Sequence, residues 1–122
     1  MLREILENET AAGNYVIAGG DFNQTFCTAD AGRFPQQEGK WQSGQLDASA
    51  FSDSWQFLMD EEVPSCRSLD QPYEGADRDA FQYYMIDGFI VSDNIETVSF
   101  GAEDLEFRNS DHNPLLAEFR LK

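Results

Sequence analysis

The sequence predicts a protein of the mixed α/β (α+β) class, because one amphipathic helical segment precedes several strand-like segments. Leu2, Ile5 and Leu6 fall on one face of a helix, and the small and polar residues of Ala11–Asn14 would end it. Strands are predicted at Tyr15–Ala18, Phe81–Ser92, Ile95–Phe100 and Leu115–Leu121. We expect three or four strands in one sheet, mixed or antiparallel near the C-terminal end.

The first predicted strand, Tyr15–Ala18, is a short apolar run, which is typical of a strand covered on both faces. Gly19-Gly20-Asp21-Phe22-Asn23 follows it directly. In open α/β sheets, ligands bind at the carboxyl ends of the strands. The helix, the strand and this turn therefore predict an α/β unit that presents Asp21 and Asn23.

The segment Gln24–Gln82 is long and polar, and prolines and glycines interrupt it throughout. A loop of this length in a compact domain is usually functional or disordered. Its aromatic side chains, Trp41 and Trp55 among them, favour a packed excursion. Within it, Ser52–Leu58 is predicted to be a short capped helix.

The last two predicted strands follow from their links and their periodicity. Ser92-Asp93-Asn94 is typical of a hairpin link between Phe81–Ser92 and Ile95–Phe100. In Leu115–Leu121 the odd-numbered positions are all apolar and the even-numbered ones mostly polar, a period of two that predicts a half-buried strand.

The length of 122 residues predicts a single domain that spans residues 1–122. Ten Phe residues supply a core, so the chain is not a disordered acidic tail. Eight basic against 23 acidic residues give a formal charge of −15, which repels bare nucleic-acid backbone and anionic membranes unless cations intervene. No segment resembles a signal peptide or a membrane span, and no compartment is predicted.

Cys27 and Cys66 are too few and too isolated to predict a disulfide framework or a zinc site. One bridge between them is possible. Arg67 and Arg78 could contact an anionic substrate, although surface ion pairing is the more common role for such residues.

Asp21 and Asn23 are the first candidate site residues. Two positions apart on extended backbone, their side chains can point to the same side, and the preceding glycines let a ligand approach closely. A turn is the alternative, since Gly, Asp and Asn are good turn formers. A calcium loop that starts at Asp21 is excluded, because its required Gly and Glu positions hold Phe26 and Gly32.

Asp87 lies within an apolar strand-like run, where an unpaired carboxylate would cost several kcal/mol. A buried acid beside an imidazole fixes the ring tautomer and stabilises the imidazolium. His112 is the only histidine of the chain and hence the candidate partner. The alternative is that Asp87 accepts backbone N–H bonds at a bulge near Gly88.

Asp111 and His112 precede Pro114 in a loop, where neighbouring side chains can point into one pocket. Asp111 suits a hard divalent cation, and His112 would contact a phosphoryl oxygen with Asp87 behind it. A surface turn is the alternative for this segment.

The order and spacing of these motifs resemble the C-terminal half of the endonuclease/exonuclease/phosphatase superfamily, the deoxyribonuclease I-like proteins. The motifs are an apolar strand ending in Gly20-Asp21-Phe22-Asn23, the strand Ile86-Asp87-Gly88-Phe89-Ile90-Val91-Ser92, and Ser110-Asp111-His112-Asn113-Pro114 before a final strand. The resemblance covers Tyr15 to Leu121. It implies one sheet-plus-helix half of a four-layer α/β sandwich.

The resemblance also implies an activity, namely hydrolysis of phosphodiesters or phosphomonoesters that depends on Mg²⁺ or Mn²⁺. Asp21 is similar to the acid that activates or orients the attacking water, and would also lie near the metal. Asn23 would orient that acid or contact the phosphate and the metal. Asp111 is similar to a metal-site residue, and His112 to the imidazole that stabilises the pentacovalent phosphate, oriented by Asp87.

Two departures from the family pattern are visible. Gly88 stands where an aromatic often follows the acid. The N-terminal half of the family, which supplies an Asn and a metal-binding Glu, has no counterpart before Tyr15. We therefore expect the chain to be the C-terminal portion of such a domain, poorly active alone, with an apolar sheet face that self-associates or meets the missing half.

Two alternatives from other classes stay open. One is a non-catalytic interaction module that keeps the fold. The other is a small acidic domain that binds cations or sugars. The substrate class of an enzyme is not predicted beyond a phosphate ester.

Overall fold

The computed structural model describes residues 1–122 and combines one α-helix with nine short strands, which confirms the α+β class. Helix α1 spans Leu2–Ala11, close to its predicted bounds. The strands are β1 (Ile17–Asp21), β2 (Gln24–Phe26), β3 (Gly44–Leu46), β4 (Trp55–Leu58), β5 (Cys66–Arg67), β6 (Tyr83–Tyr84), β7 (Asp87–Ser92), β8 (Ile95–Ala102) and β9 (Leu115–Leu121). Two 3₁₀ turns lie at Ala48–Ala50 and Arg78–Ala80.

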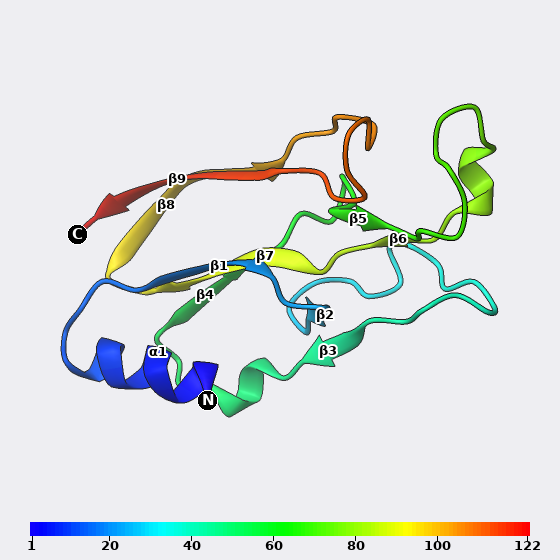
Figure 1. Cartoon of the computed structure of the whole chain (residues 1–122). Coiled ribbons are helices and arrows are strands. Elements are labelled where there is room, and N and C mark those ends of the chain that lie inside the picture. Colours follow the sequence, from blue (N-terminus) through cyan, green and yellow to red (C-terminus); the bar gives the residue numbers. More distant parts are fainter.

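The central sheet has the strand order β1-β7-β4, and both pairs are antiparallel (Figure 1). Strand β7 lies in the middle, so its apolar residues are the most deeply buried, with Ile90 and Val91 both 0% exposed. The register pairs Asp21 at the end of β1 with Asp87 at the start of β7. Two of the predicted site residues are therefore neighbours through backbone pairing alone.

One face of this sheet packs on the main core. Leu6 from α1, Val16, Phe26 and Ile90 form its buried centre. Phe26 makes edge-to-face contacts with Phe57, 5.6 Å between ring centroids, a favourable geometry for aromatic pairs. The sheet is therefore held to the helix by a small aromatic and aliphatic core.

The other face is covered by the β8–β9 hairpin, which lies beside the central sheet in Figure 1. Phe89 from β7 packs edge-to-face against Phe100 and Phe119 of the hairpin. Asp60, after β4, accepts a hydrogen bond from the backbone N–H of Ala102 at 2.8 Å. These contacts hold the hairpin to the central sheet by side chains, without strand pairing.

The central sheet has three antiparallel strands, within the expected number. The expectation that the last two predicted strands belong to the same sheet is wrong, because β8 and β9 form a separate two-stranded sheet. Their antiparallel register pairs Ile95 with Leu121. The alternation predicted for Leu115–Leu121 is present along most of β9, with exposed Leu116, Glu118 and Arg120.

Two further expectations need correction. The first strand begins at Ile17 instead of Tyr15 and lies at the edge of its sheet. It is not covered on both faces, because all its residues except Ala18 are exposed, Ile17 to 47%. Ser52–Leu58 does not form a helix. Its second half is β4, which pairs with β7 (Phe57 opposite Ile90), and the aromatic Trp55 and Phe57 suit a strand.

The long segment Gln24–Gln82 is a packed excursion, as its aromatic residues predicted. It contains β2 to β5, and the Tyr84 hydroxyl donates to the carbonyl of Trp41 at 2.7 Å. Tyr73 packs edge-to-face on Phe81 and Phe107. The segment therefore folds back onto β6 and the loop before β9.

Several apolar side chains of the strands are solvent-exposed, among them Ile17, Val98, Leu116 and Leu121. Self-association through an apolar sheet face stays a prediction. The single α-helix is too short and too polar to cross a membrane.

Gly88 is required by its neighbours. A Cβ at this position would lie 2.5 Å from the backbone carbonyl of Leu58 and 2.7 Å from the Phe26 ring. No larger side chain fits without moving β4, which explains why this chain lacks an aromatic after Asp87.

We expect Gly88→Ala to lower the free energy of unfolding by about 1–3 kcal/mol, because overpacking displaces β4 or Phe26. Gly44→Ala is the matched control, since its Cβ would make only ordinary contact with Gln24 at 3.7 Å. Urea unfolding of both variants measures the difference. Equal midpoints for the two would contradict the packing around β7.

Candidate functional site

The candidate site forms where three chain segments meet. Asp21 ends β1 and lies opposite Asp87, the first residue of β7. Cys66 of β5 pairs with His112 in an isolated antiparallel bridge, which brings in the loop before β9. All three predicted polar clusters therefore lie at one end of the central sheet.

The loop with Asp111 and His112 is held from inside by Asn113, which is 2% exposed. Its side chain donates to the carbonyl of Pro64 at 3.0 Å and accepts from the backbone N–H of Leu105 at 3.1 Å. Its backbone N–H donates to the carbonyl of Ser65 at 2.9 Å. These bonds join the loop to the segment before β5. Ser110 is exposed and Asp111 and His112 are partly exposed, so the segment is a surface loop that is anchored from inside.

Asp87 contacts His112, as the sequence predicted. The Oδ2 atom of Asp87 lies 2.8 Å from Nδ1 of His112, and the Asp87 side chain is 13% exposed. Burial raises the pKa of Asp87, while hydrogen bonds with Ser65 and His112 offset part of that rise. The Asp87 carboxylate accepts no backbone N–H bond near Gly88, so that alternative is wrong. The backbone N–H of Asp87 itself donates to the Ser65 hydroxyl at 3.1 Å.

This contact determines where the second ring nitrogen points. Nε2 of His112 lies 3.8 Å from Oδ2 of Asp21 and 3.9 Å from Oδ2 of Asp111. It faces an open cavity of about 370 Å³ that Asp21, Asn23, Asp111 and His112 help to line. Asp21 and Asp111 remain 38% and 31% exposed, so solvent and small ligands reach both carboxylates.

Asn23 lies in a turn and also lines the candidate site, so both interpretations of this residue apply. Its φ of 53° is left-handed, a conformation that Asn tolerates well, and its backbone N–H donates to Oδ1 of Asp21 at 2.8 Å. The turn therefore exists, and it fixes one oxygen of Asp21 while Oδ2 faces His112. The Asn23 residue lines the same cavity.

Three carboxylates, from Asp21, Asp87 and Asp111, surround one imidazole, and Asp21, Asp87 and His112 place ligand atoms within 4.8 Å of one another. No Lys or Arg forms an ion pair with any of these acids. Oxygen ligands with this excess of negative charge fit a hard divalent cation such as Mg²⁺ or Mn²⁺.

Sequence reasoning missed Cys66, Ser65 and Asn113. Burial, followed by the negative charges of Asp111 and Asp87, raises the pKa of the Cys66 thiol to about 12, so it is a poor nucleophile. Both cysteines are free, and Cys27 is exposed, so the possible disulfide is not formed.

No local sequence pattern marks Cys66, Ser65 and Asn113 as site residues, because backbone pairing across the chain places them at the site.

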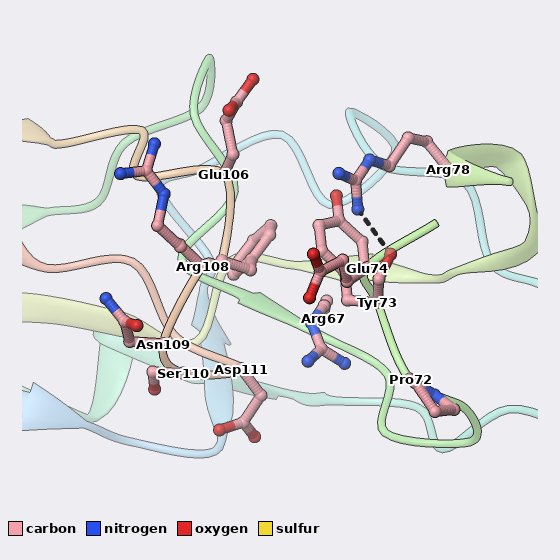
Figure 2. Close-up of a pocket in the computed structure, with 11 residues that line it drawn as sticks. Arg67, Pro72, Tyr73, Glu74, Arg78, Glu106, Arg108, Asn109, Ser110 and Asp111 are labelled. Atoms are coloured by element: carbon pink, nitrogen blue, oxygen red, sulfur yellow. Dashed lines mark hydrogen bonds between the residues drawn. The ribbon is translucent and has the colours of Figure 1, made fainter. Parts of the chain in front are cut away.

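A second hollow of about 570 Å³ adjoins the first and shares Arg67 and Asp111 with it (Figure 2). Arg78 and Arg108 also line it. The ion pairing expected for Arg67 and Arg78 is absent, since neither has a carboxylate oxygen within 4.0 Å. Their guanidinium carbons instead lie 4.7 and 3.6 Å from the centre of the Tyr73 ring.

Comparisons of the chain with protein-family models, with curated proteins and with solved structures found no match.

We expect Asn113→Ala to lower the free energy of unfolding by about 1–3 kcal/mol, because it removes the two hydrogen bonds of a buried side chain, to the carbonyl of Pro64 and from the N–H of Leu105. Asn109→Ala is the control, since Asn109 is exposed and its side chain makes no hydrogen bond within the protein. Urea unfolding measures both variants. A loss no larger than that of the control would contradict an anchoring role for Asn113.

Proposed function

We propose that this chain carries the C-terminal share of a metal-dependent phosphoesterase site of the deoxyribonuclease I-like type. The observation that carries the proposal is the Asp87–His112 hydrogen bond of 2.8 Å, which turns Nε2 toward a cavity lined by Asp21 and Asp111. Packing of the central sheet between α1 and the β8–β9 hairpin is compatible with half of a four-layer sandwich.

Asp111 and Asp21 would hold Mg²⁺ or Mn²⁺, because both present exposed carboxylate oxygens beside the cavity. The cation would offset negative charge on the phosphoryl oxygens of the substrate. Arg67 is the one Lys or Arg that lines this cavity, so a cation would supply much of the positive charge that a phosphate requires.

Each protein group then has a defined task in hydrolysis of the phosphorus–oxygen ester bond. Asp21 orients the attacking water and takes its proton, and the turn at Asn23 fixes that carboxylate. Protonated His112 donates from Nε2 to a phosphoryl oxygen as negative charge accumulates there. Asp87 holds the ring and stabilises its positive charge.

The arginine hollow supports an anionic substrate. Arg67, Arg78 and Arg108 account for three of the eight basic residues, and none of them is neutralised by a carboxylate within 4.0 Å. In a chain of charge −15, such unpaired guanidinium groups beside the cavity would contact the non-reacting part of a phosphate ester. We propose a phosphate ester without specifying its alcohol.

The family resemblance implies a further Asn and a metal-binding Glu that lie outside these 122 residues. Each missing contact would remove about 2–4 kcal/mol of transition-state stabilisation. We therefore propose that the isolated chain hydrolyses phosphate esters slowly, and that an N-terminal half would accelerate it.

Hydrolysis of bis-p-nitrophenyl phosphate tests the proposal. We expect slow turnover that requires Mg²⁺ or Mn²⁺ and stops when a chelator is added. Asp21→Ala and His112→Ala should reduce the rate at least about 100-fold, because each removes a group that acts on the reacting atoms. Asp87→Asn should reduce it similarly, because the ring keeps an acceptor but loses the compensating charge.

Asp53→Ala is the matched control, since Asp53 is an exposed acid for which the structure shows no hydrogen bond or ion pair. It should retain the full rate, and circular dichroism should show that every variant is folded. Turnover equal in wild type and in the site variants, or independent of metal, would contradict the proposed function and favour a non-catalytic module.

A further inference from the structure

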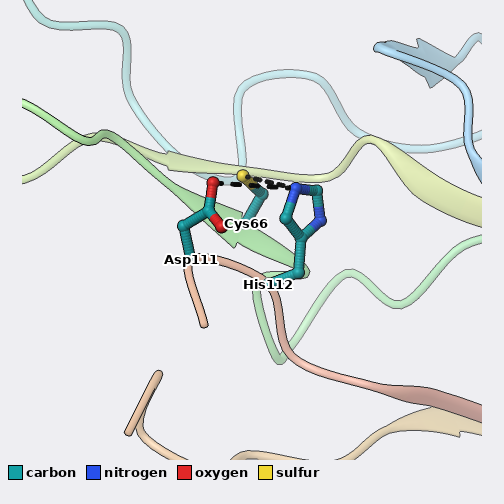
Figure 3. Close-up of side chains that lie close together, drawn as sticks. All are labelled: Cys66, Asp111 and His112. Atoms are coloured by element: carbon teal, nitrogen blue, oxygen red, sulfur yellow. Dashed lines mark hydrogen bonds and ion pairs between the residues drawn. The ribbon is translucent and has the colours of Figure 1, made fainter. Parts of the chain in front are cut away.

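Cys66 lies within the site, although no step of the proposed hydrolysis uses it. Its sulfur is 3.5 Å from Nε2 of His112, and that nitrogen is 3.9 Å from Oδ2 of Asp111. The three ligand atoms all lie within 4.8 Å of one another. Figure 3 shows the thiol, the imidazole and the carboxylate turned toward one another.

The backbone holds these three residues in place. Cys66 and His112 are paired residues of an antiparallel bridge, so their side chains lie side by side on one face. The backbone N–H of Arg67 donates to the carbonyl of Asp111 at 3.0 Å. Cys66 is 6% exposed and cannot turn away into solvent without disturbing β5.

We propose that Cys66, Asp111 and His112 form a binding site for a thiophilic divalent cation, Zn²⁺ above all. Zinc prefers a tetrahedral set of sulfur, nitrogen and oxygen ligands, whereas Mg²⁺ binds oxygen and avoids sulfur. Binding exchanges the thiol proton for the metal and releases that proton to solvent. The cavity leaves the fourth position open to water or to an anion.

Two ligand–ligand distances can be compared with this geometry. With ordinary zinc bond lengths, tetrahedral ligands lie about 3.6 Å apart for sulfur and nitrogen and about 3.4 Å apart for nitrogen and oxygen. The structure has 3.5 and 3.9 Å for these two pairs. The sulfur of Cys66 and the carboxylate of Asp111 lie within 4.8 Å of each other. The carboxylate would have to move closer to both other ligands, and it is 31% exposed.

The two metal sites exclude each other. Zinc would take the Asp111 carboxylate and Nε2 of His112, the same groups that the proposed hydrolysis needs for Mg²⁺ and for the phosphoryl oxygen. Zinc at this site therefore inhibits the magnesium-dependent reaction. This consequence rests on the proposed function, whereas the binding itself does not.

Cobalt(II) absorption tests the binding without any measurement of activity. Co²⁺ replaces Zn²⁺ in such sites, and a cobalt–thiolate bond gives a charge-transfer band in the near ultraviolet. We expect the band in wild type and in Cys27→Ser, its loss in Cys66→Ser, and its stoichiometric displacement by zinc. Cys27 is the matched control, because it is the only other thiol and is exposed.

The band also reports on the other two ligands. Asp111→Asn should weaken cobalt binding at least about tenfold, since one of three ligands is lost. Circular dichroism establishes that Cys66→Ser is folded, and the chemical shift of the single imidazole should respond to zinc in wild type. A band that persists in Cys66→Ser, or no band in wild type, would overturn the proposal.

Inhibition is measured separately on the ester substrate in excess Mg²⁺. Zinc should inhibit wild type and Cys27→Ser, and at least about tenfold more zinc should be needed for Cys66→Ser. A cobalt band without hydrolysis would leave the zinc site standing and count against the phosphoesterase. Hydrolysis without a cobalt band would count against the zinc site and leave the phosphoesterase standing.

Discussion

The hydrogen bond between Asp87 and His112 is the constraint on which the rest of the site depends. A carboxylate buried at the start of the central strand is costly unless it has a partner, and the imidazole is that partner at 2.8 Å. Because Nδ1 is engaged, Nε2 is the only ring nitrogen left to act on a ligand. Its three neighbours, Asp21, Asp111 and Cys66, then define what it can bind.

The fold places these groups by backbone pairing. The antiparallel register of β1 and β7 sets Asp21 opposite Asp87, and the bridge between Cys66 and His112 brings in the loop before β9. Asn113 holds that loop from inside. The same arrangement places carboxylate oxygens and one sulfur around a single nitrogen, so the two metals that we propose would compete for the same groups.

Charge differs between the two adjoining hollows, although they share Arg67 and Asp111. The acids around His112 have no Lys or Arg partner, whereas Arg67, Arg78 and Arg108 line the second hollow without a carboxylate within 4.0 Å. Stacking on Tyr73 keeps Arg67 and Arg78 at that position. A cation on one side and guanidinium groups on the other would together compensate the charge of a phosphate ester in a strongly acidic chain.

The sequence was sufficient to predict features that local pattern or elimination determines. The helix and β9 follow from periodicity, and the partner of Asp87 follows because the chain has one histidine. The separate β8–β9 sheet, strand β4 and the position of Cys66 depend on contacts between distant residues. Strands of two to four residues, such as β5 and β4, are too short to show a period.

The tautomer of His112 reports directly on the hydrogen bond between Asp87 and His112. Because the chain has one histidine, long-range ¹H–¹⁵N correlation spectra give the two ring nitrogens without ambiguity. At a pH where the ring is neutral, the structure predicts the proton on Nδ1, facing Asp87, and a free Nε2. In Asp87→Ala this preference should be lost. A wild-type ring protonated on Nε2, or one unaffected by Asp87→Ala, would contradict the account.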